Sequence, residues 1–74
     1  MHAKVKAYVQ GLRWAGIKEL LFELSTAYHV DLKILDEDKG LLRTTIFYQI
    51  EGEEQDVRKF REELRKAMEE YNKE

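Results

Sequence analysis

The order in which apolar side chains recur along the chain constrains its fold more than any other feature. The stretch "KVKAYVQ", residues 4–10, alternates apolar with polar residues, which predicts a half-buried β-strand. A second stretch repeats apolar residues every three or four positions, the spacing that lines one face of an α-helix. This stretch predicts a helix from about residue 15 to residue 28. Its apolar face consists of Ile17, Leu20, Leu21, Leu24 and Tyr28.

The middle of the chain predicts a β-hairpin. Val30, Leu32 and Ile34 alternate with other residues, and "LLRTTIFYQIEG" resumes the alternation after "DEDKG". We expect "DEDKG" to be the turn, with Gly40 in the left-handed conformation that a short loop needs at its end. The buried face of the third strand should consist of Leu42, Thr44, Ile46, Tyr48 and Ile50.

Residues 53–74 predict a second helix. Glu53, Glu54 and Asp56 stand at its start, where negative charge suits the positive end of the helix dipole. Spaced apolar residues give this helix a single apolar face. They are Val57, Phe60, Leu64, Ala67 and Tyr71.

These elements predict one α+β domain over residues 1–74, in the order β-α-β-β-α. Because both helices are apolar on one side only and the strands alternate, the helices should cover one face of a three-stranded antiparallel sheet. A right-handed crossover between the first two strands favours the strand order 1-3-2. The result resembles a ferredoxin-like half-sandwich without its last strand, in which the first strand is an open edge.

The small size of the chain predicts self-association. A chain of 74 residues buries only about 60% of the surface that it exposes when unfolded, so its core gives a small margin of stability. The absence of cysteine excludes disulfides and cysteine-based zinc sites, so self-association is the remaining way to add stability.

Charged residues make up 38% of the chain and proline is absent, a composition typical of hyperthermophile proteins and of designed ones.

No segment carries a signature of membrane insertion or of catalysis. No apolar run approaches the roughly 18 residues of a membrane span, and the N-terminus lacks a signal-peptide core, so we expect a cytoplasmic protein. His2 and His29 have no partner at metal-ligand spacing, and no serine or threonine stands in a nucleophile signature. We therefore expect no enzyme activity, no cofactor and no metal.

The side of the sheet without helices should carry the interaction surface. Tyr8, Leu35 and Phe47 would face water there, and exposed apolar residues that cluster mark an interface. We predict an interface of Tyr8, Leu35, Thr45 and Phe47 in a homo-oligomer, with a homodimer as the expected state. Aromatic residues ringed by lysines also suit stacking of single-stranded nucleic acid, although a pI of 5.7 argues against that alternative.

The only tryptophan stands in "VQGLRWAGIKELL", residues 9–21, between the first strand and the first helix. If the helix begins as early as Arg13, Trp14 falls on the same stripe as Ile17 and belongs to the core. If the helix begins at Gly16, Trp14 projects from a loop toward a ligand or a partner. Both interpretations remain open from the sequence.

Two long segments, "AGIKELLFELSTAYHVDLKIL" and "TTIFYQIEGEEQDVRKFREELRKA", resemble the ACT-domain pattern, and the resemblance covers roughly residues 4–67. It implies a small regulatory module that pairs with a second copy and holds an amino acid near the glycine that opens its first helix. The implied ligand-side residues are Trp14, Gly16 and Ile17. Gly11 and Arg13 of the same loop join them, because glycine lets backbone N–H groups approach a ligand and arginine can meet a carboxylate. A designed or scaffold protein without a ligand is the remaining alternative.

Overall fold

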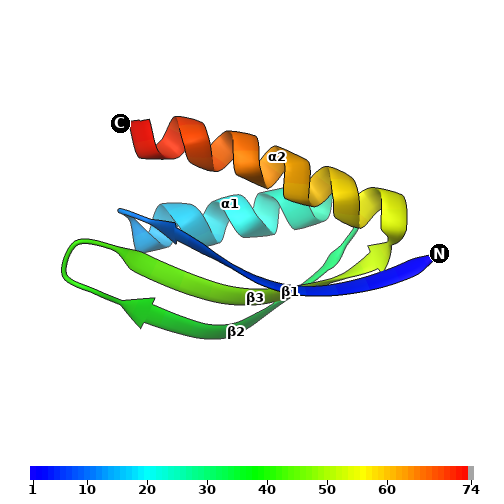
Figure 1. The fold of residues 1–74 in the computed structure, drawn as a ribbon, viewed down its shortest axis with the longest axis horizontal. Coiled ribbons are helices and arrows are strands. Elements are labelled where there is room, and N and C mark those ends of the chain that lie inside the picture. Colours follow the sequence, from blue (N-terminus) through cyan, green and yellow to red (C-terminus); the bar gives the residue numbers. More distant parts are fainter. Residues whose placement is uncertain (74) are drawn as a thin grey trace.

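The computed structural model describes residues 1–73, with the side chains of residues 14, 72 and 73 left out. Both helices lie on the same face of the sheet (Figure 1). The α+β order β-α-β-β-α and the ferredoxin-like half-sandwich expected from the sequence are confirmed. The elements are β1 (His2–Gly11), α1 (Trp14–Ala27), β2 (Asp31–Lys39), β3 (Thr44–Glu53) and α2 (Glu54–Lys73).

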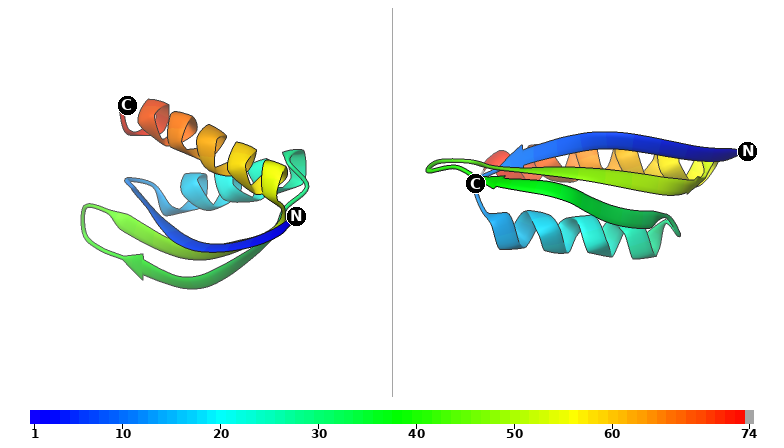
Figure 2. Two further views of the ribbon diagram at one scale, coloured as in Figure 1. Left: turned by 45° about the vertical axis from the view of Figure 1, so that its right-hand side comes forward. Right: turned by 90° about the horizontal axis from the view of Figure 1, so that it is seen from below.

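The sheet has the strand order β1-β3-β2, and both outer strands run antiparallel to β3. The crossover through α1 leaves a gap between β1 and β2, and the hairpin returns β3 into that gap. The predicted order 1-3-2 is therefore confirmed, and β1 and β2 are the two edges of the sheet. Figure 2 shows α2 over the β1 side of the sheet and α1 over the β2 side.

The core lies between the sheet and the two helices. Its fully buried members are Phe60, Ile17, Leu21, Ile46 and Ile50, so both predicted helix stripes face the sheet. Met68 of α2 is also buried, at 9% exposure, although the predicted apolar face did not include it. It stands four residues after Leu64, so the helical spacing places it on the same face. Neither α1 nor α2, as described, is both long and apolar enough to cross a membrane.

The predicted turn at "DEDKG" is wrong, because Asp36–Lys39 continue strand β2. The pairing register shifts between Ile34 and Asp36, which leaves Leu35 as the extra residue of a β-bulge. Asp36 Oδ1 accepts a hydrogen bond of 2.8 Å from the backbone N–H of Glu37 at this bulge. Glu37 Oε2 in turn lies 3.6 Å from Nζ of Lys18 on α1. The charged residues 36–39 therefore stay paired with β3, and Glu37 forms an ion pair on the helix side of the sheet.

The hairpin loop therefore consists of residues 40–43. Leu42, predicted to be buried, lies in this loop with 79% of its surface exposed. Gly40 does not adopt the predicted left-handed conformation. Its backbone N–H donates to the carbonyl oxygen of Arg43 at 2.8 Å, and a Cβ at Gly40 would lie 2.8 Å from that same oxygen. Glycine is needed there for space and not for its φ angle.

Among the residues described with a side chain, His29 has its backbone in the left-handed region, with a φ of 57°. It follows the last residues of α1, where the N–H of Val30 bonds the carbonyl of Ser25 at 3.0 Å and the N–H of His29 bonds that of Thr26 at 3.4 Å. This pair of bonds is a Schellman motif, which terminates many helices and usually has glycine at the left-handed position. Histidine at that position is strained.

We expect His29→Gly to raise the free energy of unfolding by about 0.5–1 kcal/mol, since relief of left-handed strain outweighs the extra chain entropy of glycine. His29→Ala is the matched control, because it removes the imidazole and keeps the Cβ. Urea denaturation of the three proteins measures the difference. Equal stability of the glycine and alanine variants would contradict a strained backbone at this residue.

Candidate functional site

The side of the sheet opposite the helices, here called the outer face, presents rows of three residues, one from each strand. The register sets Tyr8 opposite Phe47 and Phe47 opposite Asp36. Residues of neighbouring strands that pair in this way point to the same face of a sheet. The other rows are Lys4, Glu51 and Asp31, then Lys6, Gln49 and Lys33, and finally Gln10, Thr45 and Asp38.

An aromatic pair lies in the row of Tyr8, Phe47 and Asp36. The ring centroids of Tyr8 and Phe47 are 5.9 Å apart with an interplanar angle of 45°, a tilted contact between neighbouring strands. Tyr8 is 61% exposed and Phe47 is 39% exposed. The bulge sets Leu35 beside Asp36, opposite Phe47, and leaves it 43% exposed. Tyr8, Leu35 and Phe47 together form what we call the outer patch.

The structure brings the fourth predicted interface residue to the same face. Thr45 lies next to the outer patch, opposite Gln10, and its hydroxyl accepts a hydrogen bond of 3.3 Å from Gln10 Nε2. Further exposed leucines stand at the nearby end of the sheet, where Gly11 pairs with Thr44. They are Leu12 in the loop before α1 and Leu41 and Leu42 in the hairpin loop.

The outer face is not basic, although the sequence indicates a ring of lysines around its aromatic residues. Because Asp36 and Asp38 belong to β2 and not to a turn, they point to this face and offset its lysines. The face carries Lys4, Lys6 and Lys33 together with Asp31, Asp36, Asp38 and Glu51.

Glu51 remains ionised on this face to lower pH than an ordinary glutamate. His2 Nε2 lies 2.6 Å from Glu51 Oε2, and this hydrogen bond holds the pKa of the Glu51 carboxyl below its usual value. Protonation of this carboxylate therefore requires a more acidic solution. The positive charge of the neighbouring Lys4 also lowers the pKa of Glu51, because it favours the ionised carboxylate.

The loop predicted to hold a ligand is filled by core side chains at its glycines. A Cβ at Gly11 would lie 2.5 Å from Cδ1 of Ile17, and Ile17 is fully buried. A Cβ at Gly16 would lie 2.6 Å from the hydroxyl of Tyr71, which donates to the carbonyl of Arg13 at 3.0 Å. Close packing therefore accounts for both glycines, and a ligand role for this loop stays a prediction.

The remaining residues of that loop are spread around the start of α1. The helix begins at Trp14, and Arg13 is its exposed N-cap residue, with no hydrogen bond from its side chain to the helix end. A helix start at Gly16, on which the loop interpretation depended, is therefore wrong. The side chain of Trp14 lies outside the described residues, so its place in the core stays a prediction. A cavity of about 270 Å³ adjoins the loop, lined by Gln10, Gly11, Leu12 and Arg43.

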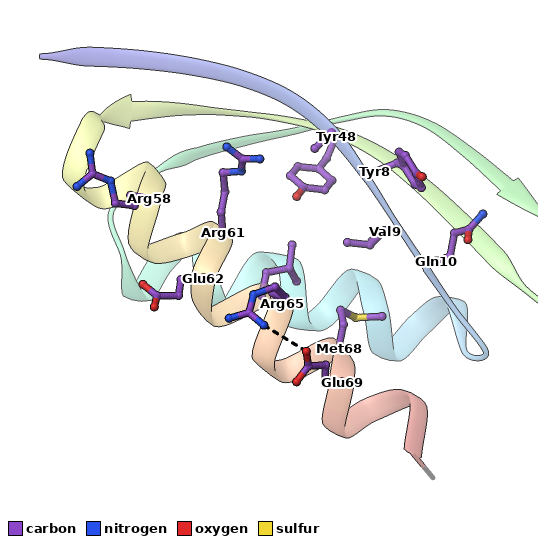
Figure 3. A pocket seen from close by; sticks show the side chains of 12 residues that line it. Tyr8, Val9, Gln10, Tyr48, Arg58, Arg61, Glu62, Arg65, Met68 and Glu69 are labelled. Carbon is purple, nitrogen blue, oxygen red and sulfur yellow. Dashed lines mark hydrogen bonds and ion pairs between the residues drawn. The ribbon is translucent and has the colours of Figure 1, made fainter.

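Sequence reasoning missed a groove of about 730 Å³ between β1 and α2. Val9, Leu64 and Met68 give it an apolar floor, and the hydroxyl end of Tyr48 points toward it (Figure 3). Its α2 side carries Arg58, Arg61 and Arg65, together with Glu62 and Glu69. The signal in the sequence was the spacing of three and four between these arginines, which sets them in one row beside the apolar stripe of α2.

Within residues 1–73, no group of three or more histidine, aspartate or glutamate side chains is placed to hold a metal ion.

Comparison with protein-family models, with curated proteins and with solved structures gives no match for this chain. The resemblance to ACT domains therefore rests on the quoted segments alone.

The packing role of Gly11 can be tested with a compensating change. We expect Gly11→Ala to lower the free energy of unfolding by about 1–3 kcal/mol, because the new methyl group overlaps Cδ1 of Ile17. Ile17→Val removes that carbon at a cost of about 0.5–1.5 kcal/mol. In the Ile17→Val background, the penalty for Gly11→Ala should shrink by about 1 kcal/mol in a urea double-mutant cycle. Simple additivity of the two changes would contradict the contact.

Proposed function

We propose that the protein is a small homo-oligomeric interaction module whose copies associate through the outer face of the sheet. The observation that carries this proposal is the outer patch of Tyr8, Leu35 and Phe47, which is contiguous, apolar and exposed. A domain with so small a core gains stability when such a patch is buried, since buried apolar surface contributes about 25 cal/mol per Å².

The residues around the outer patch suit contact with an identical surface. Lysines and acidic residues both lie on the face, so a twofold axis can set a lysine of one copy against an aspartate of the other. Aromatic anchors with a charged surround match the usual anatomy of interfaces, in which a few desolvated side chains supply most of the affinity. Tyr8 and Phe47 are the anchors in this proposal.

The same charge balance argues against the alternative of nucleic-acid stacking. Single-strand binding combines aromatic platforms with a positively charged groove along the backbone. Here Asp36 lies in the same row as the aromatic pair, and Asp38 and Glu51 add further negative charge. Phosphates would be repelled at the point where bases would have to stack.

We expect Phe47→Ala to weaken self-association by about 2 kcal/mol or more, or about thirtyfold in Kd, because a central anchor is removed. Sedimentation equilibrium over a dilution series measures this change. Phe22→Ala is the matched control, since Phe22 is an exposed phenylalanine on α1, away from the outer face. It should leave the oligomer unchanged.

Fluorescence anisotropy with a labelled single-stranded oligonucleotide separates the two functions. If the patch is an interface, wild type and Phe47→Ala should both show negligible binding. Salt-dependent binding that falls by about 1–3 kcal/mol in Phe47→Ala, with the oligomeric state unchanged, would instead support base stacking. A wild-type chain that stays monomeric and folded at high concentration would refute self-association.

A further inference from the structure

The two edges of the sheet differ in how well they are protected. Strand β2 carries the bulge at Leu35 and then four charged residues in succession, 36–39, features that prevent another strand from pairing with an edge. Strand β1 has ten consecutive pairs with β3 and no shift of register. It contains no proline. Its outer backbone N–H and C=O groups therefore form a long, regular edge that can accept a further strand.

The groove beside that edge is built to receive side chains. It lies on the helix side of β1, between β1 and α2, where Val9 and Met68 line it (Figure 3). Leu64 adds a third apolar side chain to the lining. In a strand paired with β1, every second side chain would point to the helix side and enter this groove. An apolar floor of this kind favours apolar side chains at those positions.

Several polar groups that line the groove have no hydrogen bond or ion pair among the described residues, and they include the Tyr48 hydroxyl, Arg61 and the oppositely charged Glu62. Tyr48 is only 3% exposed, and its hydroxyl makes no hydrogen bond among the described residues, but it is not sealed from solvent, because no fully buried polar side-chain atom there lacks a partner. The hydroxyl points toward the open groove (Figure 3). Arg58 and Arg65 are paired with glutamates of α2 at 3.3 and 3.2 Å, whereas Arg61 takes part in none of the ion pairs among the described residues. Burial raises the pKa of Tyr48, so this phenol is a neutral donor, and the charge of Arg61 is close enough to oppose that rise.

We propose that the edge of β1 and the groove between β1 and α2 bind an extended peptide segment of a partner protein that carries an acidic side chain among apolar ones. The peptide backbone adds a strand to β1, and a helix-side carboxylate accepts hydrogen bonds from the Arg61 guanidinium and the Tyr48 hydroxyl. The charge of Arg61 selects the acidic residue, and the floor selects its apolar neighbours.

A second copy of the chain fits this groove less well. The helix-side residues of its own open edge are Ala3, Val5, Ala7, Val9 and Gly11, none of which carries a carboxylate. Its other edge is the bulged strand β2. The peptide site thus goes beyond self-association, since it uses the helix side of the sheet and leaves Leu35 and Phe47 of the outer patch free.

The test uses the whole chain labelled with ¹⁵N and a synthetic peptide of eight residues with capped ends. The peptide alternates threonine with valine and carries one glutamate in place of a central valine. One control peptide has glutamine in place of that glutamate, and another is N-methylated at alternate residues so that it cannot pair with a strand. Titrations followed by amide shifts and by anisotropy give the site and the affinity.

We expect the glutamate peptide to shift the backbone amides of β1 and to bind about tenfold more tightly than the glutamine peptide, because its carboxylate gains charge-assisted hydrogen bonds. The N-methylated peptide should not bind. Arg61→Gln should abolish the preference for glutamate over glutamine, a loss that general destabilisation would not cause, and Tyr48→Phe should reduce that preference. Lys59→Gln, an exposed charge change on α2 outside the groove lining, should leave it intact.

Three results would overturn the proposal. One is the absence of β1 shifts at millimolar peptide, and another is equal affinity for the glutamate and glutamine peptides. The third is dissociation of the oligomer by the peptide, which would assign the edge to a second copy. Loss of the oligomer in Phe47→Ala with peptide binding retained would separate the two surfaces.

Discussion

Strand β3 is the element on which the rest of the structure depends. It pairs along its length with both other strands, so each ladder of the sheet passes through it. Its helix-side residues Ile46, Tyr48 and Ile50 are buried beneath the helices. Because the hairpin joins β3 to β2 and α2 follows directly, the position of this strand sets the positions of both edges and of the last helix.

Alternation along β3 also connects the two proposed surfaces. Phe47 points to the outer face, and the next residue, Tyr48, points to the helix side and reaches the groove. A shift of the register by one residue would exchange these directions and expose Ile46 and Ile50. The buried isoleucines therefore hold the outer patch and the groove in their places, although they belong to neither surface.

The bulge at Leu35 shapes both sides of the molecule. It keeps the acidic run of β2 in the ladder, which turns Asp36 and Asp38 outward and Glu37 toward Lys18. The outer face consequently has balanced charge, which favours contact with another protein over contact with phosphates. The same irregularity protects the β2 edge, so that β1 remains as the regular edge of the sheet.

The sequence by itself determined the element order and the face of the strand residues outside 35–42, because periods of two and 3.6 residues depend only on local backbone geometry. It also determined the strand order, through the right-handed crossover between the first two strands. The contact of Tyr8 with Phe47 followed from that alternation and antiparallel pairing. Only the tertiary structure decided the bulge, since nothing local in residues 34–37 marks which residue leaves the ladder. It also decided that Gly11 makes room for Ile17. The groove joins the first strand to the last helix, and residues so distant in sequence meet only when α2 packs on the sheet.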